Sequence, residues 1–194
     1  MKTKRLFMAL AFICLCLCAN GQNGINNGHE YVDLGLPSGL KWATCNVGAS
    51  SPEEYGDYYA WGEIETKSEY TEDNSKTYGK SMSDISGKSK YDVARSKWGG
   101  SWRLPTKEEF NELRQKCKWQ WTTQNGKKGY KVTGPNGNSI FLPAAGCYNG
   151  RSGLIEVGQW GHYWCSTPYN HNNGAQAYSL TIATNSLNLF YSNR

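Results

Sequence analysis

The residue types that most often carry out catalysis are few and widely spaced in this sequence. Two histidines at i, i+4 spacing on a helix can bind one metal ion together. No two of His29, His162 and His171 have this spacing. No Cys-x-x-Cys motif is present, so the cysteines lack the ligand spacing of common zinc sites. The sequence therefore predicts neither a metal site nor a catalytic residue, and we expect a protein that is not an enzyme.

Carboxylates and phosphate-binding strings are also poorly placed for chemistry. Two Gly-Lys-Ser strings begin at Gly79 and Gly87, but neither follows the glycine that a P-loop requires five residues earlier. Asp57, Glu63 and Glu65 are close enough in the chain to converge on a calcium ion, although carboxylates in polar segments more often face solvent. We therefore expect no cofactor, with structural calcium at these carboxylates as the alternative left open.

Aromatic side chains are the strongest functional signal, because the chain has 8 Trp and 13 Tyr residues. Aromatic rings stack on the C–H faces of sugars and asparagines bond to sugar hydroxyls, and the string YNHNNG that begins at Tyr169 offers both groups. A small β-rich domain also fills its core with such rings, as we expect of Trp119 and Trp121. The candidate ligand-binding residues are Tyr148, Trp160, Tyr163, Tyr169, Asn170 and His171.

Short strands must position these candidates. Period-two alternation and the strong hairpin signal Asn136-Gly137 indicate antiparallel pairs joined by tight turns. The polar segment 63–90 has little periodicity and is predicted to be a long surface loop. The predicted strands are 31–36, 41–47, 57–62, 119–123, 130–133, 139–142, 160–167, 177–183 and 187–191.

Two helices are expected in the first half of the chain. Thr106 and Glu109 form a capping-box pattern, and Phe110, Leu113 and Cys117 follow on one helical face. A shorter helix is predicted over 92–98, ended by two glycines. Together with the strands, these helices predict an α+β fold of short, mostly antiparallel hairpins.

The first 21 residues have the pattern of a signal peptide. Three cations precede the apolar run 6–18, which is too short to span a bilayer at ~20 residues. Cleavage is expected after Gly21, with a cut after Ala19 as the alternative. The predicted divisions are a signal peptide at 1–21, a flexible leader at 22–30 and one folded domain at 31–194.

Export determines the expected charge, location and cysteine chemistry. Loss of the leader's three cations lowers the net charge from +5 to +2, so no nucleic-acid partner is expected. We expect a secreted protein of the periplasm or the outer cell surface, with no transmembrane segment after cleavage. Four cysteines in an oxidising compartment favour two disulfides, with three pairings open. These cysteines are Cys45, Cys117, Cys147 and Cys165.

Four longer strings carry a family resemblance. They are EYVDLGLPSGLKWATCNVGASSPEEYGDYYAWGE, GGSWRLPTKEEFNEL, GYKVTGPNGNSIFLPAAG and YWCSTP. Together they resemble the Fibrobacter succinogenes major paralogous domain, a family of exported bacterial proteins whose function is largely unassigned. The string RLPTKEEF is also distantly similar to a helix of the formylglycine-generating enzyme, which implies a C-type-lectin-like fold.

The resemblance implies further expectations. The copper-binding cysteine pair near the C-terminus of the formylglycine-generating enzyme has no counterpart here, which argues against its oxidase chemistry. Cys147 and Cys165 replace Tyr and Ser of the family pattern, which predicts the disulfide Cys147–Cys165, with Cys45–Cys117 as the other. The family continues into a closing strand beyond Arg194, so the C-terminal strand is expected to be missing and strand 31–36 to have an unpaired edge.

These observations favour an exported, non-catalytic binding module that recognises a polysaccharide or surface glycan through aromatic-rich loops. The alternative is a structural or adhesive cell-surface protein whose partner is another protein, docked at the unpaired edge.

Overall fold

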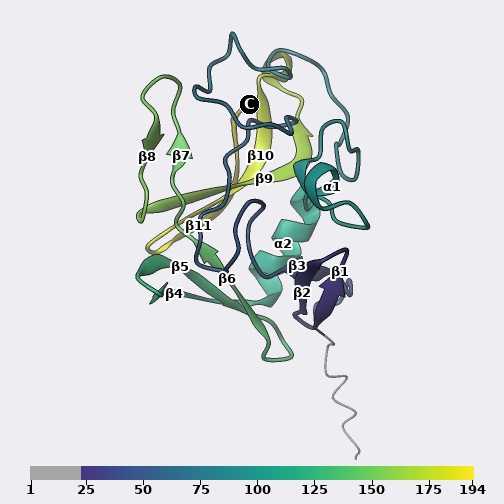
Figure 1. The fold of residues 1–194 in the computed structure, drawn as a ribbon, viewed down its shortest axis with the longest axis vertical. Helices are drawn as coiled ribbons and strands as arrows, with labels where there is room; N and C mark the ends of the chain where they lie inside the picture. Colours follow the sequence, from purple (N-terminus) through teal and green to yellow (C-terminus); the bar gives the residue numbers. More distant parts are fainter. Residues whose placement is uncertain (1–22) are drawn as a thin grey trace, which may run out of the picture.

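Short antiparallel strands dominate the fold (Figure 1). The computed structural model describes residues 23–194, so the predicted signal peptide lies outside the described residues. Within this range, eleven strands form three three-stranded sheets and one two-stranded sheet, alongside two α-helices, which confirms the predicted α+β class. The elements are β1 (Gly24–Asn26), β2 (His29–Asp33), β3 (Lys41–Ala43), α1 (Val93–Trp98), α2 (Lys107–Lys116), β4 (Lys118–Gln124), β5 (Lys127–Thr133), β6 (Ser139–Pro143), β7 (Cys147–Tyr148), β8 (Leu154–Ile155), β9 (Trp160–Tyr169), the 3-10 turn η1 (Asn172–Gly174), β10 (Gln176–Ala183) and β11 (Ser186–Asn193).

Helix α2 begins at the predicted capping box. The Thr106 side chain accepts a hydrogen bond from the Glu109 backbone N–H at 3.2 Å, and the Glu109 carboxylate accepts one from the Thr106 N–H at 2.8 Å. The carboxylate also binds the Arg103 guanidinium through both of its oxygens, at 2.5 and 2.7 Å. Because these contacts satisfy backbone donors that a helix leaves unpaired, they fix where α2 begins.

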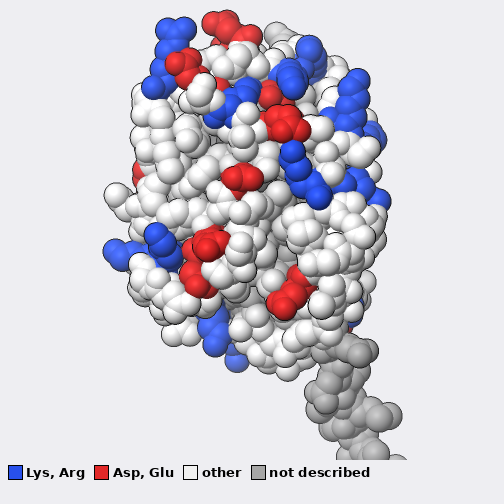
Figure 2. All heavy atoms as spheres, viewed as in Figure 1, with Lys and Arg blue, Asp and Glu red and all other residues white. Residues whose placement is uncertain are grey.

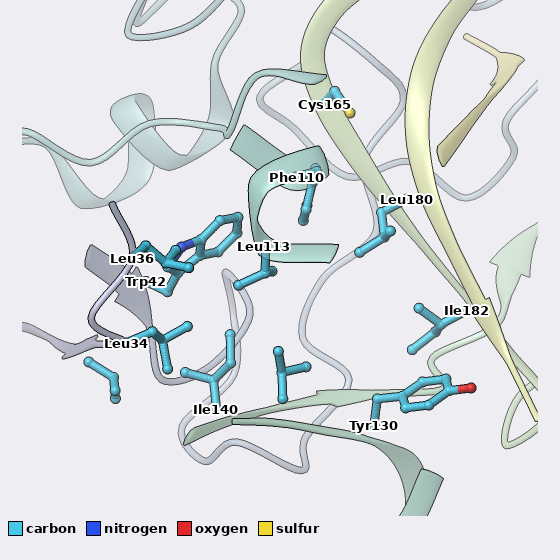
Figure 3. Close-up of a cluster of buried hydrophobic side chains, with 12 residues drawn as sticks. Leu34, Leu36, Trp42, Phe110, Leu113, Tyr130, Ile140, Cys165, Leu180 and Ile182 are labelled. Atoms are coloured by element: carbon cyan, nitrogen blue, oxygen red, sulfur yellow. The ribbon is translucent and has the colours of Figure 1, made fainter. Parts of the chain in front are cut away.

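The main core forms around α2 (Figure 3). Phe110 and Leu113 are buried on one face of the helix, as the spacing predicts, and the ring of Phe110 lies 5.4 Å from that of Trp42 in β3. Leu180 and Ile182 of β10 face the same cluster. Trp119 and Trp121 pack against it edge-on to Tyr130, as expected for core aromatics.

The β9–β10–β11 sheet contacts both α2 and the long segment 44–92. Helix α2 contacts all three strands on one face of the sheet. Toward the other side, Trp61 of the long segment donates from Nε1 to the Cys165 carbonyl at 2.8 Å, and Trp164 donates from Nε1 to the Tyr59 carbonyl at 2.9 Å. Two indole hydrogen bonds thus hold a segment that has no regular strand between β3 and α1, as expected for residues 63–90 but not for residues 57–62, which the sequence predicts to be a strand.

The N-terminal part of the domain differs from expectation in two ways. Residues 24–26, expected to be a flexible leader, form β1 and pair with β2 across a tight turn in which Asn27 and Gly28 both have positive φ. Asn-Gly is the sequence that such two-residue hairpins favour. Strand β2 therefore lies between β1 and β3, and the expectation that this strand has an unpaired edge is wrong.

The predicted disulfide Cys147–Cys165 is absent, because both cysteines are free thiols. The Cys147 thiol lies beside His162 of β9. Side chains alternate along a strand, so positions 162 and 165 of β9 face opposite sides of the sheet. Cys165 points into the main core, whereas Cys147 lies on the other side.

The predicted disulfide Cys45–Cys117 is absent as well. Cys45 follows β3 in a loop whose neighbouring residues, Ala43 and Val47, pack against the Trp98–Trp102 cluster near α1. Cys117 packs against the main core at the far end of α2. The two cysteines thus belong to different packing clusters, and the fold is not stapled by disulfides.

Charges on the face shown in Figure 2 are mixed. Lys and Arg side chains are interspersed with Asp and Glu, and broad uncharged areas lie between them. That face therefore offers no continuous basic surface of the kind that nucleic acids favour.

Candidate functional site: an aromatic-lined cavity

A cavity of about 660 Å³ opens beside β9. Its walls come from β3 and the start of the long segment, from α1 and the residues that lead into α2, from the β6–β7 connection with its neighbouring residues, and from β9. Residues 57–62, predicted to be a strand, form an irregular part of this wall, because side-chain hydrogen bonds replace the ladder of a sheet. The volume is within the range of about 300–1,000 Å³ that small-molecule sites occupy.

Three tyrosines form a cluster in this wall. The ring of Tyr148 lies 5.3 Å from that of Tyr58, edge to face, and 4.8 Å from that of Tyr70. The Tyr58 hydroxyl donates to the Ala145 carbonyl at 2.6 Å, and the Tyr70 hydroxyl donates to the Tyr58 carbonyl. Burial raises the pKa of Tyr58 to about 12, so its hydroxyl remains a donor at neutral pH. These bonds hold the rings in place.

Deeper in the cavity, larger rings form the wall. Trp61 is 1 % exposed, and its indole lies 4.2 Å from the Arg194 guanidinium. The Tyr163 hydroxyl donates to the Pro143 carbonyl, and burial raises the pKa of this tyrosine. Tryptophan and tyrosine rings therefore form a part of the cavity wall.

The carboxylates that we considered for calcium do not share a site. Glu63 is 2 % exposed and accepts from Lys67 Nζ at 3.0 Å, whereas Glu65 is exposed and pairs with Lys97 at 3.0 Å. Asp57 accepts a hydrogen bond from the Tyr59 hydroxyl at 3.1 Å. Each carboxylate has its own partner, and these three groups do not form a common ligand set.

Arg194 also lines the cavity. Its Nε donates to the Gln176 carbonyl at 2.9 Å and its Nη1 to the Lys80 carbonyl at 2.8 Å. Burial lowers the pKa of the guanidinium to about 10, so it keeps its charge at neutral pH. Its Nη2 is buried without a hydrogen-bond partner, as is Nε1 of Trp42, another residue that lines the cavity. Two donors are thus left without an acceptor.

The structure separates the six predicted ligand-binding residues. Tyr148 and Tyr163 line the cavity. Trp160, at the start of β9, is half-buried and stacks on His162 with ring centroids 6.4 Å apart. The remaining three residues lie at or beyond the other end of β9: Tyr169, Asn170 and His171.

That other end carries a second aromatic cluster. The rings of Tyr169 and Tyr191 stack at 4.1 Å, and His171 lies 5.0 Å from Tyr169. Phe190, which is 56 % exposed, stacks on Tyr191 at 4.3 Å. The members Tyr169, His171 and Tyr191 are not among the residues that line the cavity beside β9.

Tyr58 and Tyr70, which line the cavity beside Tyr148, are not among the ligand-binding residues that the sequence predicts. The sequence places Tyr58 in the predicted strand 57–62 and Tyr70 in the polar segment 63–90, which is predicted to be a surface loop. The density of tyrosines in the string YGDYYAWG, together with an aromatic inside a polar loop, was the available signal.

Comparison of the chain with protein-family models, curated proteins and solved structures finds no match. Membership of the Fibrobacter succinogenes major paralogous family and the C-type-lectin-like fold therefore stay predictions. No helix within residues 23–194 combines the length and apolar character needed to cross a bilayer.

Proposed function

We propose that this protein is an exported, non-catalytic module that binds a polysaccharide or surface glycan in the aromatic-lined cavity. The observation that carries the proposal is the cluster of Tyr58, Tyr70 and Tyr148, whose rings are in mutual contact. Hydroxyl hydrogen bonds also hold the rings of Tyr58 and Tyr70. Rings held in this way provide apolar contact area at low cost in conformational entropy. Sugar C–H faces suit such a surface.

Polar groups of the cavity support the same ligand class. Arg194 Nη2 and Trp42 Nε1 are buried donors without acceptors, and each belongs to a residue that lines the cavity. Leaving such a donor unsatisfied costs about 1–3 kcal/mol. A ligand rich in hydroxyl oxygens would supply the missing acceptors, which a purely apolar ligand cannot do.

Oxidase chemistry of the formylglycine-generating type is disfavoured by the setting of Cys165. This thiol is 0 % exposed, and burial raises its pKa. A buried, protonated thiol is a poor nucleophile. The lectin-like family resemblance, an extracellular or periplasmic location and the absence of catalysis form one consistent proposal.

Glycan-array and polysaccharide-binding measurements on the full chain test this proposal. The variant Tyr148→Ala should weaken binding of a recognised glycan by roughly 2- to 12-fold, because an aromatic contact contributes about 0.5–1.5 kcal/mol. The variant Tyr169→Ala, in the second aromatic cluster, is the matched control and should bind as the parent does. Near-ultraviolet circular dichroism checks that each variant is folded.

Two outcomes would contradict the proposal. A folded parent protein that binds no glycan removes the function, and a loss of binding only in Tyr169→Ala moves the site to the second aromatic cluster.

An adhesive role with a protein partner is the second candidate. It is favoured by β11, the outer strand of its sheet, which carries the exposed Phe190. An uncovered strand edge can pair with a strand of another chain. Association that persists when Tyr148 is replaced, but that is lost in Phe190→Ser, would favour this candidate.

A further inference from the structure

We propose that Cys147, Glu156 and His162 form a binding site for a divalent cation of the zinc class at the edge of the cavity. One possible ligand atom from each residue, the thiol sulfur, a carboxylate oxygen and an imidazole nitrogen, lies within 4.8 Å of the other two. Cys147 and His162 also line the cavity. The proposal is independent of glycan binding.

Strand pairing explains why three residues distant in sequence converge. Cys147 of β7 is paired with Ile155 of β8, so Glu156 follows directly after its partner. On the other side, Gly146 forms a parallel bridge with Gly161 at the start of β9. Cys147 is thus a paired residue, and Glu156 and His162 each follow directly after one. The backbone pairing therefore brings the three side chains close together.

The imidazole of His162 lacks a partner that its burial requires. Its Nε2 is buried and makes no hydrogen bond, since the nearest carboxylate oxygen, on Glu156, is 3.7 Å away. A neutral imidazole nitrogen without a hydrogen bond is the form that coordinates a metal ion.

The backbone of Glu156 is held in an uncommon conformation. Its φ of 61° lies in the left-handed region, which residues other than glycine seldom adopt. The Glu156 carbonyl accepts hydrogen bonds from the N–H groups of Gln159 and Trp160, both at 3.0 Å. This turn holds the carboxylate beside the other two ligand candidates while ending β8, and such strain is common at binding sites.

The chemical types of the three ligand atoms favour one class of metal ion. Thiolate, imidazole and carboxylate together are typical of zinc, whereas calcium and magnesium prefer oxygen ligands alone. Ligand atoms around tetrahedral zinc are roughly 3.3–3.8 Å apart, given bonds of about 2.0–2.3 Å. A contraction of about 1 Å from the observed limit would satisfy this geometry, and the exposed side chain of Glu156 has room to move. Three protein ligands leave a fourth position for water or a ligand oxygen.

A nucleophilic role for the same cysteine is the competing interpretation. A Cys–His–carboxylate group can activate a thiol, but burial and the nearby Glu156 raise the pKa of Cys147. A bound cation would reverse this effect, because metal binding deprotonates the coordinating thiol.

Zinc titration by calorimetry and cobalt absorption spectroscopy test the site on the full chain. Three further cysteines in the N-terminal segment, Cys14, Cys16 and Cys18, are replaced by Ser throughout, so that they cannot contribute. One zinc ion per chain is expected, with a thiolate-to-cobalt charge-transfer band. The variants Cys147→Ser, Glu156→Gln and His162→Gln should each lose about 10-fold or more in affinity.

Matched controls replace the same residue types elsewhere. The control variants are Cys45→Ser, Glu108→Gln and His171→Gln, and each should bind zinc as the parent does. No zinc binding by the parent, or equal losses in site and control variants, would overturn the proposal.

Thiol protection keeps the test decisive if a site variant fails to fold. In the parent, zinc should slow alkylation of Cys147 by iodoacetamide at least 10-fold, measured by peptide mass spectrometry, while alkylation of Cys45 is unchanged. Equal labelling of Cys147 with and without zinc refutes the metal site. If Cys147 also reacts faster than Cys45 in zinc-free protein, the nucleophilic interpretation takes its place.

Discussion

At the scale of single residues, buried carboxylates are stabilised by specific donors. Asp92 is fully buried and accepts hydrogen bonds from three backbone N–H groups, those of Gly87, Arg95 and Leu104, at 2.7–3.1 Å. It thereby caps α1 and joins that helix to the chain on both sides. The Asp92 side chain thus holds together three backbone segments, two of which have no regular secondary structure.

Asp33 should make stability depend on pH. A hydrogen bond from Lys41, followed by one from the Gly35 N–H, holds the pKa of this carboxyl below its ordinary 3.8. A depressed pKa stabilises the folded state above the unfolded-state pKa, and this stability is lost as pH falls through the folded-state pKa. Asp33→Asn should therefore lower the free energy of unfolding at neutral pH by about 1–2 kcal/mol, allowing for the exposure of Lys41, and should flatten its decline in acid.

Urea denaturation between about pH 7 and about pH 2 measures this effect. The exposed Asp73→Asn variant is the control and should follow the parent. A parallel acid decline in Asp33→Asn and the parent would show that Asp33 does not carry the dependence.

At the scale of elements, α2 is the part that the sequence specifies most completely. Its capping box and the burial of Phe110 and Leu113 on one face follow from local pattern, whereas Cys117, expected on the same helical face, is the extended residue at which the helix ends. The β4–β5 hairpin is similarly local, because Asn125 and Gly126 provide the two positive φ angles of its turn.

Removing the cap should weaken α2 by a known amount. In Thr106→Ala, the Glu109 N–H loses its side-chain acceptor, and N-cap replacements of this kind cost about 0.5–2 kcal/mol. Thr66→Ala, in the exposed loop, should change stability by less than about 0.5 kcal/mol. Chemical denaturation followed by circular dichroism measures the free energy of unfolding of both variants. Similar losses in both would show that the Thr106 cap does not stabilise α2.

At the scale of the whole molecule, the fold is stabilised by packing and not by the predicted disulfides. We expect the melting temperature to be the same with and without dithiothreitol, because Cys45, Cys117, Cys147 and Cys165 are all free. A disulfide worth about 2–4 kcal/mol would instead make reduction lower it by several degrees. Alkylation in denaturant without prior reduction should label all four cysteines. Protection of any pair would restore the disulfide prediction.

Features that depend on residues close together in the sequence could be predicted, whereas features that depend on distant residues could not. Helix α2 and the hairpins were predictable because turn residues and periodicity act over a few positions. The cavity was not, because Tyr58 and Tyr148 meet only through the tertiary fold. Counting cysteines favoured disulfides, but alternation along β9 separates Cys147 from Cys165, which no spacing rule anticipates. The Cys147–His162 neighbourhood was missed for the same reason.

The indole hydrogen bonds that hold the long segment also have a consequence for the order of folding. Trp61 and Cys165 are 104 residues apart in the chain, and Trp164 and Tyr59 are 105 apart. Closing loops of this length is entropically costly, so local hairpins and α2 should form before these contacts. We therefore expect this part of the cavity wall to assemble late in folding, so that a partly folded chain would lack the proposed binding site. Only a completely folded chain would then bind the proposed ligand.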